Sequence, residues 1–177
     1  MRVAVTGTPG TGKTTVTEEL SSDIRVVHLN ECIEDNDALV QDIDTERLSK
    51  IVDLPAVDDV FANKDTILIE SHLAHHFDVD VIIVLRCHPT ELERRLQKRG
   101  MGTNKISENM EAEALDVILI ETLEKHDSEK IFEIDTSEQS ITAVAEQIDS
   151  VIAGHREPQF GLVDYSSYFL NNNHDSR

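Results

Sequence analysis

The sequence predicts an α/β fold, in which helices cover both faces of a parallel β-sheet. Short apolar runs typical of buried strands, such as VAV at residues 3–5, alternate with longer stretches of helical periodicity. The first run leads directly into a glycine-rich segment and then into a helical pattern. With 177 residues the chain has an ordinary length for one domain. We expect this domain over residues 1–154 and a C-terminal tail over residues 155–177.

The expected elements follow one another with little intervening chain. Strands are predicted at residues 2–6, 25–29, 66–70, 80–85 and 130–134. Helices are predicted from about residue 13 to 21, and at 55–61, 89–100, 107–125 and 138–153, with a loop at 101–105. Residues 30–53 are acidic and only weakly periodic, which indicates short helices in an exposed segment.

The glycine-rich segment at residues 7–14 reads GTPGTGKT and matches the phosphate-binding loop G-x-x-x-x-G-K-T. Its glycines allow backbone conformations in which several N–H groups converge on phosphate oxygens. The helix that follows directs its positive end at the same anion. The motif predicts that ATP phosphates are bound by Gly10, Gly12, Lys13, Thr14 and Thr15. Lys13 would reach the β and γ phosphates, and the Thr14 hydroxyl would bind Mg²⁺.

The composition is strongly acidic, with 35 acidic and 16 basic residues and a net charge of -19. This charge argues against sequence-independent binding of nucleic acid and against binding to anionic membranes. It suits a protein of a salt-rich, halophilic archaeal cytoplasm, where ions screen self-repulsion. The alternative is an ordinary acidic cytosolic protein. No apolar run approaches the roughly 20 residues of a membrane helix and no signal peptide is recognisable, so we expect a cytoplasmic location.

Further polar residues follow the predicted strands, where ligands bind in an open parallel sheet. Glu70 ends the third strand and would reach Mg²⁺ directly or through water. His72 would orient water or the phosphate acceptor, with a half-exposed turn histidine as the alternative, and Asn30 would face the same cleft. Arg86 ends the fourth strand and is expected to contact a phosphate, with a structural ion pair as the alternative.

Two arginines on the predicted fourth helix are candidates for catalysis. Arg95 and Arg99 lie four residues apart and therefore share one face, from which they could close over the γ phosphate. The alternative is a solvated basic face that offsets the helix dipole. Thr136 and Ser137 follow the last strand, where they would hold adenine, cap the last helix, or do both.

Three histidines, His72, His75 and His76, also form a candidate zinc set. We do not favour zinc there, because no fourth ligand is apparent and a nucleotide site is expected in that place. The tail holds more than half of the aromatic residues, which is unusual for an unstructured segment. It would either fold back on the domain or dock on a partner.

Together these residues resemble the nucleoside monophosphate kinases. The closest resemblance is to the adenylate kinase isoenzyme six family, small adenylate kinase-like ATPases linked to maturation of the small ribosomal subunit. It covers about residues 2–152. It rests on TGTPGTGKTT at 6–15, HLN at 28–30, ESH at 70–72, IVLR at 83–86, RLQKRG at 95–100 and Asn109.

The resemblance implies a three-layer P-loop NTPase fold with a five-stranded parallel sheet. It also implies a monophosphate-binding segment at about residues 30–53 and a lid at about 98–108. By this resemblance, catalysis would involve Lys13, Arg95, Arg99 and His72, with Arg99 contacting ATP. Asn30 and Arg86 would bind the monophosphate, and Thr14 and Glu70 would hold the Mg²⁺ cofactor.

The implied activity is transfer of the γ phosphate of ATP to AMP or another nucleoside monophosphate, together with ATP hydrolysis. The alternative is an ATP-hydrolysing ribosome assembly factor without significant kinase activity; a kinase for another small molecule is a weaker option. The implied protein partner is the eleventh small-subunit ribosomal protein. Three departures from the family pattern are Glu70 for aspartate, Met101 for an aromatic residue and Asn36 for a basic residue. The last leaves only Arg47 and Lys50 as cations in the monophosphate segment, which favours the assembly-factor alternative.

Overall fold

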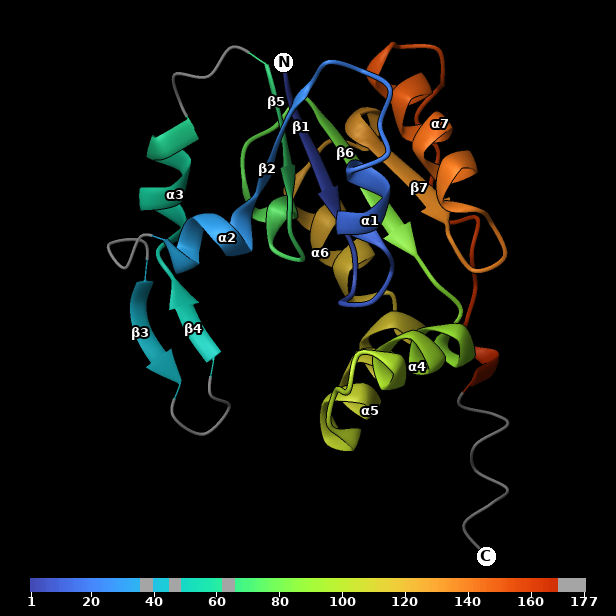
Figure 1. Ribbon diagram of the computed structural model, residues 1–177. Coiled ribbons are helices and arrows are strands. Elements are labelled where there is room, and N and C mark those ends of the chain that lie inside the picture. Colours follow the sequence, from blue (N-terminus) through green and yellow to red (C-terminus); the bar gives the residue numbers. More distant parts are fainter. Residues whose placement is uncertain (36–39, 45–48, 62–65, 169–177) are drawn as a thin grey trace, which may run out of the picture.

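A five-stranded parallel sheet forms the centre of the structure, a computed structural model that describes residues 1–35, 40–44, 49–61 and 66–168 (Figure 1). Its spatial order is β2 (Arg25–His28), β5 (Ile67–Glu70), β1 (Arg2–Thr6), β6 (Val81–Arg86) and β7 (Ile131–Asp135). All neighbouring strands pair in parallel. The predicted fold class is therefore confirmed, and the carboxyl ends of all five strands lie at one edge of the sheet.

Side chains alternate between the two faces of the sheet, as the pleat requires. On one face, Val3 and Val5 of β1 pack in a core with α1 (Lys13–Thr17) and α7 (Ile141–Ile152). On the other face, Ala4 belongs to a second core. That second core includes residues of α2 (Leu29–Glu34), α3 (Leu54–Phe61), α6 (Val117–Lys125) and the 3₁₀ turn η2 (Ala74–His76). A second 3₁₀ turn, η3 (Ser128–Lys130), leads into β7.

Two helices, α4 (Pro89–Lys98) and α5 (Thr103–Ala114), lie beyond the carboxyl ends of the strands (Figure 1). The His88 side chain accepts a hydrogen bond from the Thr90 N–H, and Pro89 occupies the first turn, where its missing donor costs nothing. Leu92 and Leu96 are buried in a third, smaller core that α5 completes. None of the helices in the described parts of the chain is long and apolar enough to cross a membrane.

The segment after α2 differs from the prediction. Instead of further short helices, residues 40–52 contain an antiparallel pair, β3 (Val40–Asp44) and β4 (Ser49–Val52). Val40 and Val52 pack against the core of the sheet. The two strands are short and contain few apolar residues, so this acidic stretch shows no clear alternation from which strands could be predicted.

The predicted helix at 107–125 is also wrong in its bounds. The chain is already helical from Thr103, where a loop was predicted, and the helix breaks between Ala114 and Val117. Asp116 has a φ of 55°, a left-handed conformation that a continuous helix excludes. Tertiary contacts of the break, described below, hold this unfavourable backbone.

The tail folds back on the domain as far as residue 168. Gln159 pairs with the edge strand β7: its carbonyl accepts from the Glu133 N–H at 2.8 Å, and its N–H donates to the Ile131 carbonyl at 3.1 Å. The Tyr165 side chain is buried and lies near Asp135 and Ser137, with its hydroxyl 3.0 and 3.1 Å from their oxygens. The tail therefore covers an otherwise open sheet edge.

We expect Tyr165→Phe to lower the free energy of unfolding by about 1 kcal/mol, because it removes the hydroxyl that joins the tail to Asp135 and Ser137. Tyr165→Ala should cost about 3 kcal/mol or more, since it also empties a buried ring site. Denaturant titration would measure both. Phe160→Ala, at an exposed tail position, is the control and should change stability by less than about 0.5 kcal/mol. Equal losses at the two positions would show that the tail is not docked.

Candidate active site

The phosphate-binding loop connects β1 to α1 and is closely packed. Gly7 has a φ of 139°, and a β-carbon there would lie 2.4 Å from the Leu85 carbonyl oxygen. Gly10 has a φ of 98°, and a β-carbon would lie 2.7 Å from side-chain carbons of Leu92 and Leu96. Glycine is thus required by both conformation and space at these two positions. The loop is held against β6 and α4.

Lys13 folds back over this loop. Its ammonium group donates to the carbonyls of Gly7 at 2.8 Å and Thr8 at 3.1 Å. Burial lowers the pKa of Lys13 to about 8, and the nearby carboxylates of Glu70 and Glu113 offset only part of this effect. A phosphate anion bound beside Lys13 would favour the charged form of the amine. The site is therefore electrostatically prepared for an anion.

Oxygen ligands for a metal ion gather next to Lys13. The Thr14 hydroxyl donates to Glu70 Oε2 at 3.2 Å, and His28 Nδ1 lies 2.9 Å from the same carboxylate oxygen. Mg²⁺ prefers such oxygen ligands and usually retains several waters. The residues present therefore fit a Mg²⁺ held by Thr14 and Glu70, with His28 orienting the carboxylate.

A cavity of about 220 Å³ brings several of the predicted residues together. It is lined by Pro9, Gly10, Gly12, Lys13, Thr14, Asn30, Glu70, His72 and Arg99. His72 is half-buried here, and burial, together with the charge of Lys13, lowers its pKa. The cavity lies at the carboxyl ends of β1 and β5, where the polar residues after these strands were expected to meet.

A larger cavity of about 580 Å³ shares Gly10, Gly12 and Arg99 with the smaller one. Its lining combines loop residues with Thr15 and Arg99, the turn after β7, and apolar side chains of α1 and α7. Val16 and Val144 supply part of this apolar surface, and Thr136 and Ser137 supply polar groups. Much of the remaining lining is charged and includes Arg94, Arg95 and Lys98 near the end of α4. The apolar patch suits a flat heterocycle such as a nucleobase, and the cations suit an anionic group attached to it.

The two candidate arginines of α4 differ in their surroundings. Arg95 donates to the Thr136 carbonyl at 2.7 Å, to the Thr136 hydroxyl at 3.1 Å, and to Glu91 at 2.8 Å. It therefore joins α4 to the turn after β7 at the wall of the larger cavity. Arg99 is exposed, makes no side-chain ion pair within the described parts of the chain, and lines both cavities.

Arg86 does not face the loop cavities, which corrects the expected phosphate contact. Its side chain is 2% exposed, and its guanidinium pairs with the carboxylates of Glu113, Glu133 and Asp116. Burial alone would lower the pKa of Arg86, but Glu113 and Asp116 raise it above its usual value. Arg86 also donates to the Glu113 carbonyl at 3.0 Å, at the end of α5. The structural ion pair is therefore the role that the geometry shows.

Glu113 is a residue of the site that the sequence did not indicate. One carboxylate oxygen accepts from Arg86 Nε at 2.8 Å and from the Cys87 N–H at 3.0 Å. The other accepts from the Thr8 hydroxyl in the loop. Glu113 thereby links the loop to Arg86, although it lies about a hundred residues from Thr8. Only a long-range pairing signal could have revealed it.

The sheet, the loop and the two cavities define a P-loop nucleotide-binding protein. The family described as "AAA domain" matches residues 3–116. A protein of Natronomonas pharaonis named "Putative adenylate kinase" is 52% identical over 95% of this chain and 99% of its own length. A protein of the same name from Halobacterium salinarum is 49% identical over 95% of this chain and 99% of its own. The chain thus belongs to the adenylate kinase-like P-loop proteins.

Among solved structures, a shikimate kinase from Acinetobacter baumannii in complex with shikimate has a similar fold. The TM-score is 0.62, and the match covers 88% of this chain and 94% of that chain. At 13% identity the similarity concerns the fold alone. It agrees with the three-layer arrangement of sheet and helices in Figure 1.

We expect Glu113→Ala to lower the free energy of unfolding by about 3 kcal/mol or more, because Arg86 would lose a buried partner. Glu113→Gln should cost less, since the amide oxygen still accepts a hydrogen bond. Glu108→Ala, at an exposed site on the same helix, is the control and should cost less than about 0.5 kcal/mol. Denaturant titration would measure all three; equal effects at Glu113 and Glu108 would contradict the assigned role.

Proposed function

We propose that this protein transfers the γ phosphate of ATP to AMP or a related nucleoside monophosphate. The observation that carries the proposal is the position of Arg99, which lines both the larger cavity and the smaller one. In this proposal the base and sugar of ATP occupy the larger cavity. Its terminal phosphates then pass over Gly10 and Gly12 to Lys13, Thr14 and Glu70.

Phosphoryl transfer depends mainly on positioning and on positive charge around the transferring group. Lys13 supplies one charge from the floor of the smaller cavity. Arg99 supplies a second from the exposed end of α4, where no ion pair with a described residue holds it back. Thr14 and Glu70 would hold Mg²⁺, which neutralises charge on the phosphate oxygens when bound. Arg95 keeps the turn after β7 in place through Thr136.

The acceptor would enter the smaller cavity from the side of Asn30, at the start of α2. The segment that follows contains the β3–β4 pair, which Figure 1 shows next to α2 and α3 and apart from α4 and α5. Asn36 and Arg47, which bear on acceptor binding, lie outside the described residues. The family resemblance supports AMP as the acceptor. The absence of a basic residue at position 36 weakens the case for AMP, because the family uses a cation there to bind the monophosphate.

A second candidate is an ATP-hydrolysing factor for small-subunit maturation that binds a basic ribosomal protein. His72 lines the same cavity as Lys13 and Glu70, so it could orient a water for attack on the γ phosphate. The net charge of -19 would complement a basic partner. The family resemblance supports this role and allows both activities in one chain.

Product analysis in concentrated potassium chloride tests these functions, with Mg²⁺–ATP alone and then with AMP added. The kinase predicts that AMP is consumed and that two molecules of ADP form per ATP. Equal phosphate release with and without AMP would show that ATP hydrolysis dominates. Absence of turnover and of ATP binding would contradict both functions.

If the acidic surface is an adaptation to salt, activity in this assay falls as the chloride is diluted.

Alanine substitutions of Arg99 and Arg95 should differ in their effect on stability. Arg99→Ala should lower kcat by about a hundredfold, because it removes a charge from the transferring phosphate. It should change the free energy of unfolding by less than about 0.5 kcal/mol, because Arg99 is exposed. Arg95→Ala should also lower stability, by about 1 to 3 kcal/mol, through its hydrogen bonds to Thr136 and Glu91. A larger loss of stability in Arg99→Ala than in Arg95→Ala would contradict the assigned roles.

A further inference from the structure

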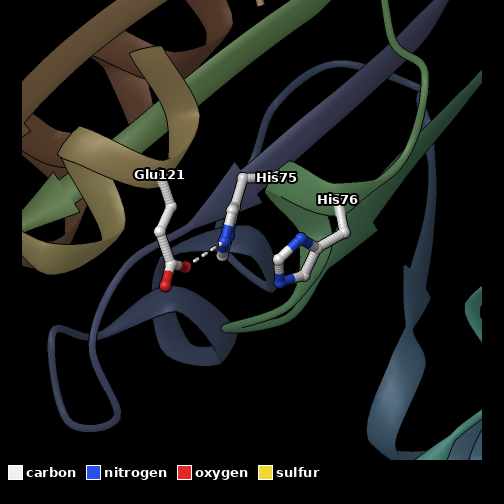
Figure 2. A group of neighbouring side chains, drawn as sticks. All are labelled: His75, His76 and Glu121. Atoms are coloured by element: carbon white, nitrogen blue, oxygen red, sulfur yellow. Dashed lines mark hydrogen bonds and ion pairs between the residues drawn. The ribbon is translucent and has the colours of Figure 1, made fainter. Parts of the chain in front are cut away.

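Three side chains outside the nucleotide cavities converge in a cluster that combines nitrogen and oxygen ligands. His75 and His76 come from η2, and Glu121 comes from the neighbouring helix α6 (Figure 2). One ligand atom of each residue lies within 4.8 Å of the others. His75 Nε2 is 2.9 Å from Glu121 Oε2, and the two imidazole rings have centroids 4.1 Å apart. We call these three residues the His–His–Glu cluster.

The cluster differs from the histidine set considered from sequence. His72 faces the smaller nucleotide cavity, so it is not a member. Glu121 takes its place from an element 46 residues further along the chain than His75. Like the set considered from sequence, the cluster offers three protein ligands, so water would have to fill the fourth position of a tetrahedral site.

The surroundings of His75 resemble those of a metal ligand. Its side chain is 2% exposed, and Nδ1 lies 3.1 Å from the Thr6 hydroxyl while Nε2 faces Glu121. A metal-binding histidine typically donates its other ring N–H to an oxygen, which sets the tautomer and the ring orientation. In the metal-free protein the neutral ring donates Nε2–H to Glu121. A metal would take the place of this proton, and Nδ1 would then donate to the Thr6 hydroxyl.

The cluster is also accessible to water. The Glu121 side chain is 43% exposed, so water can complete a coordination shell. A metal binds imidazole through a ring nitrogen that carries no proton. Lys125 adds an opposing positive charge nearby, and Glu121 compensates it.

We propose that His75, His76 and Glu121 bind one Zn²⁺ or a similar transition-metal dication, with water in the remaining position. Two imidazoles and one carboxylate match a frequent zinc ligand set. Tetrahedral Zn²⁺ holds its ligands about 2.0 to 2.2 Å from its centre. The hydrogen-bonded pair of His75 and Glu121 would therefore open slightly, and His76, whose ligand atom lies within 4.8 Å of theirs, would turn toward the same ion. The metal would fasten η2 to α6 beside Thr6, the residue that immediately precedes the phosphate loop.

The consequence is a second metal site with a structural role, separate from the Mg²⁺ expected at Thr14 and Glu70. The link between η2 and α6 already includes a hydrogen bond in which His126 Nε2 donates to the His75 carbonyl at 2.8 Å. A metal would add bonds between the same two elements. It would therefore stabilise the connection after β5 that carries His72.

A cobalt titration of the full-length, tag-free protein tests the proposal. Chelator-treated protein, kept in excess Mg²⁺, would be titrated with Co²⁺ while its visible absorption is recorded, followed by displacement with Zn²⁺. The expected result is one equivalent of Co²⁺ with the strong visible bands of a low-coordinate site, and their loss on adding Zn²⁺. His76→Gln and Glu121→Gln should each weaken Co²⁺ binding by about tenfold or more.

Matched controls change the same residue types outside the cluster. His155→Gln and Glu124→Gln alter exposed side chains and should leave Co²⁺ affinity unchanged. Thermal unfolding without metal would confirm that each variant is folded, and Zn²⁺ should raise the midpoint in the parent protein more than in the cluster variants. Absence of stoichiometric Co²⁺ binding would overturn the proposal. So would equal affinity in the parent, His76→Gln and Glu121→Gln proteins.

Discussion

Arg86 places a positive charge in the interior, and the arrangement of the surrounding segments depends on how that charge is compensated. Three carboxylates, from Glu113, Glu133 and Asp116, surround its guanidinium. A buried charge without partners is so costly that α5, the start of α6 and β7 must all bring their acids to one point. The same requirement explains the break between α5 and α6. Arg86 binds the carbonyl at the end of α5 and the side chain of Asp116, whose left-handed backbone ends the helix.

The phosphate loop is connected to this network and to the turn after β7. Glu113 accepts from the Thr8 hydroxyl, and the Thr136 hydroxyl donates to the loop carbonyl of Thr11 at 2.9 Å or to that of Arg86, which lies at the same distance. Arg95 reinforces the link by binding Thr136. A loop that must present N–H groups to phosphates is thus held from outside by side chains of other elements, which reduces the reorganisation needed when a nucleotide binds.

The tail and the His–His–Glu cluster both contact segments that adjoin the phosphate loop or the larger cavity. Tyr165 contacts Ser137, which lines the larger cavity, and its ring lies 5.5 Å from the Arg86 guanidinium carbon. On the other side of β1, His75 contacts Thr6, one residue before the loop. The loop is therefore braced on both sides. Arg99, in contrast, is exposed and has no ion pair among the described residues, which leaves it free for the closure over a ligand that we propose.

The sequence by itself determined the sheet, its helical layers and the loop, because apolar periodicity and the glycine–lysine–threonine pattern are local signals. It also indicated which strand ends would meet, so Lys13, Thr14, Asn30, Glu70 and His72 were expected in one cleft and line one cavity. Only the tertiary structure decided that Arg86 is an interior ion-pair centre, that Glu113 joins it to the loop, and that Glu121 completes a cluster with His75 and His76. These pairings bring together side chains tens of residues apart. Local propensity carries no information about them, because the free energy of burying a charge or a polar group is set by partners that only the folded chain supplies.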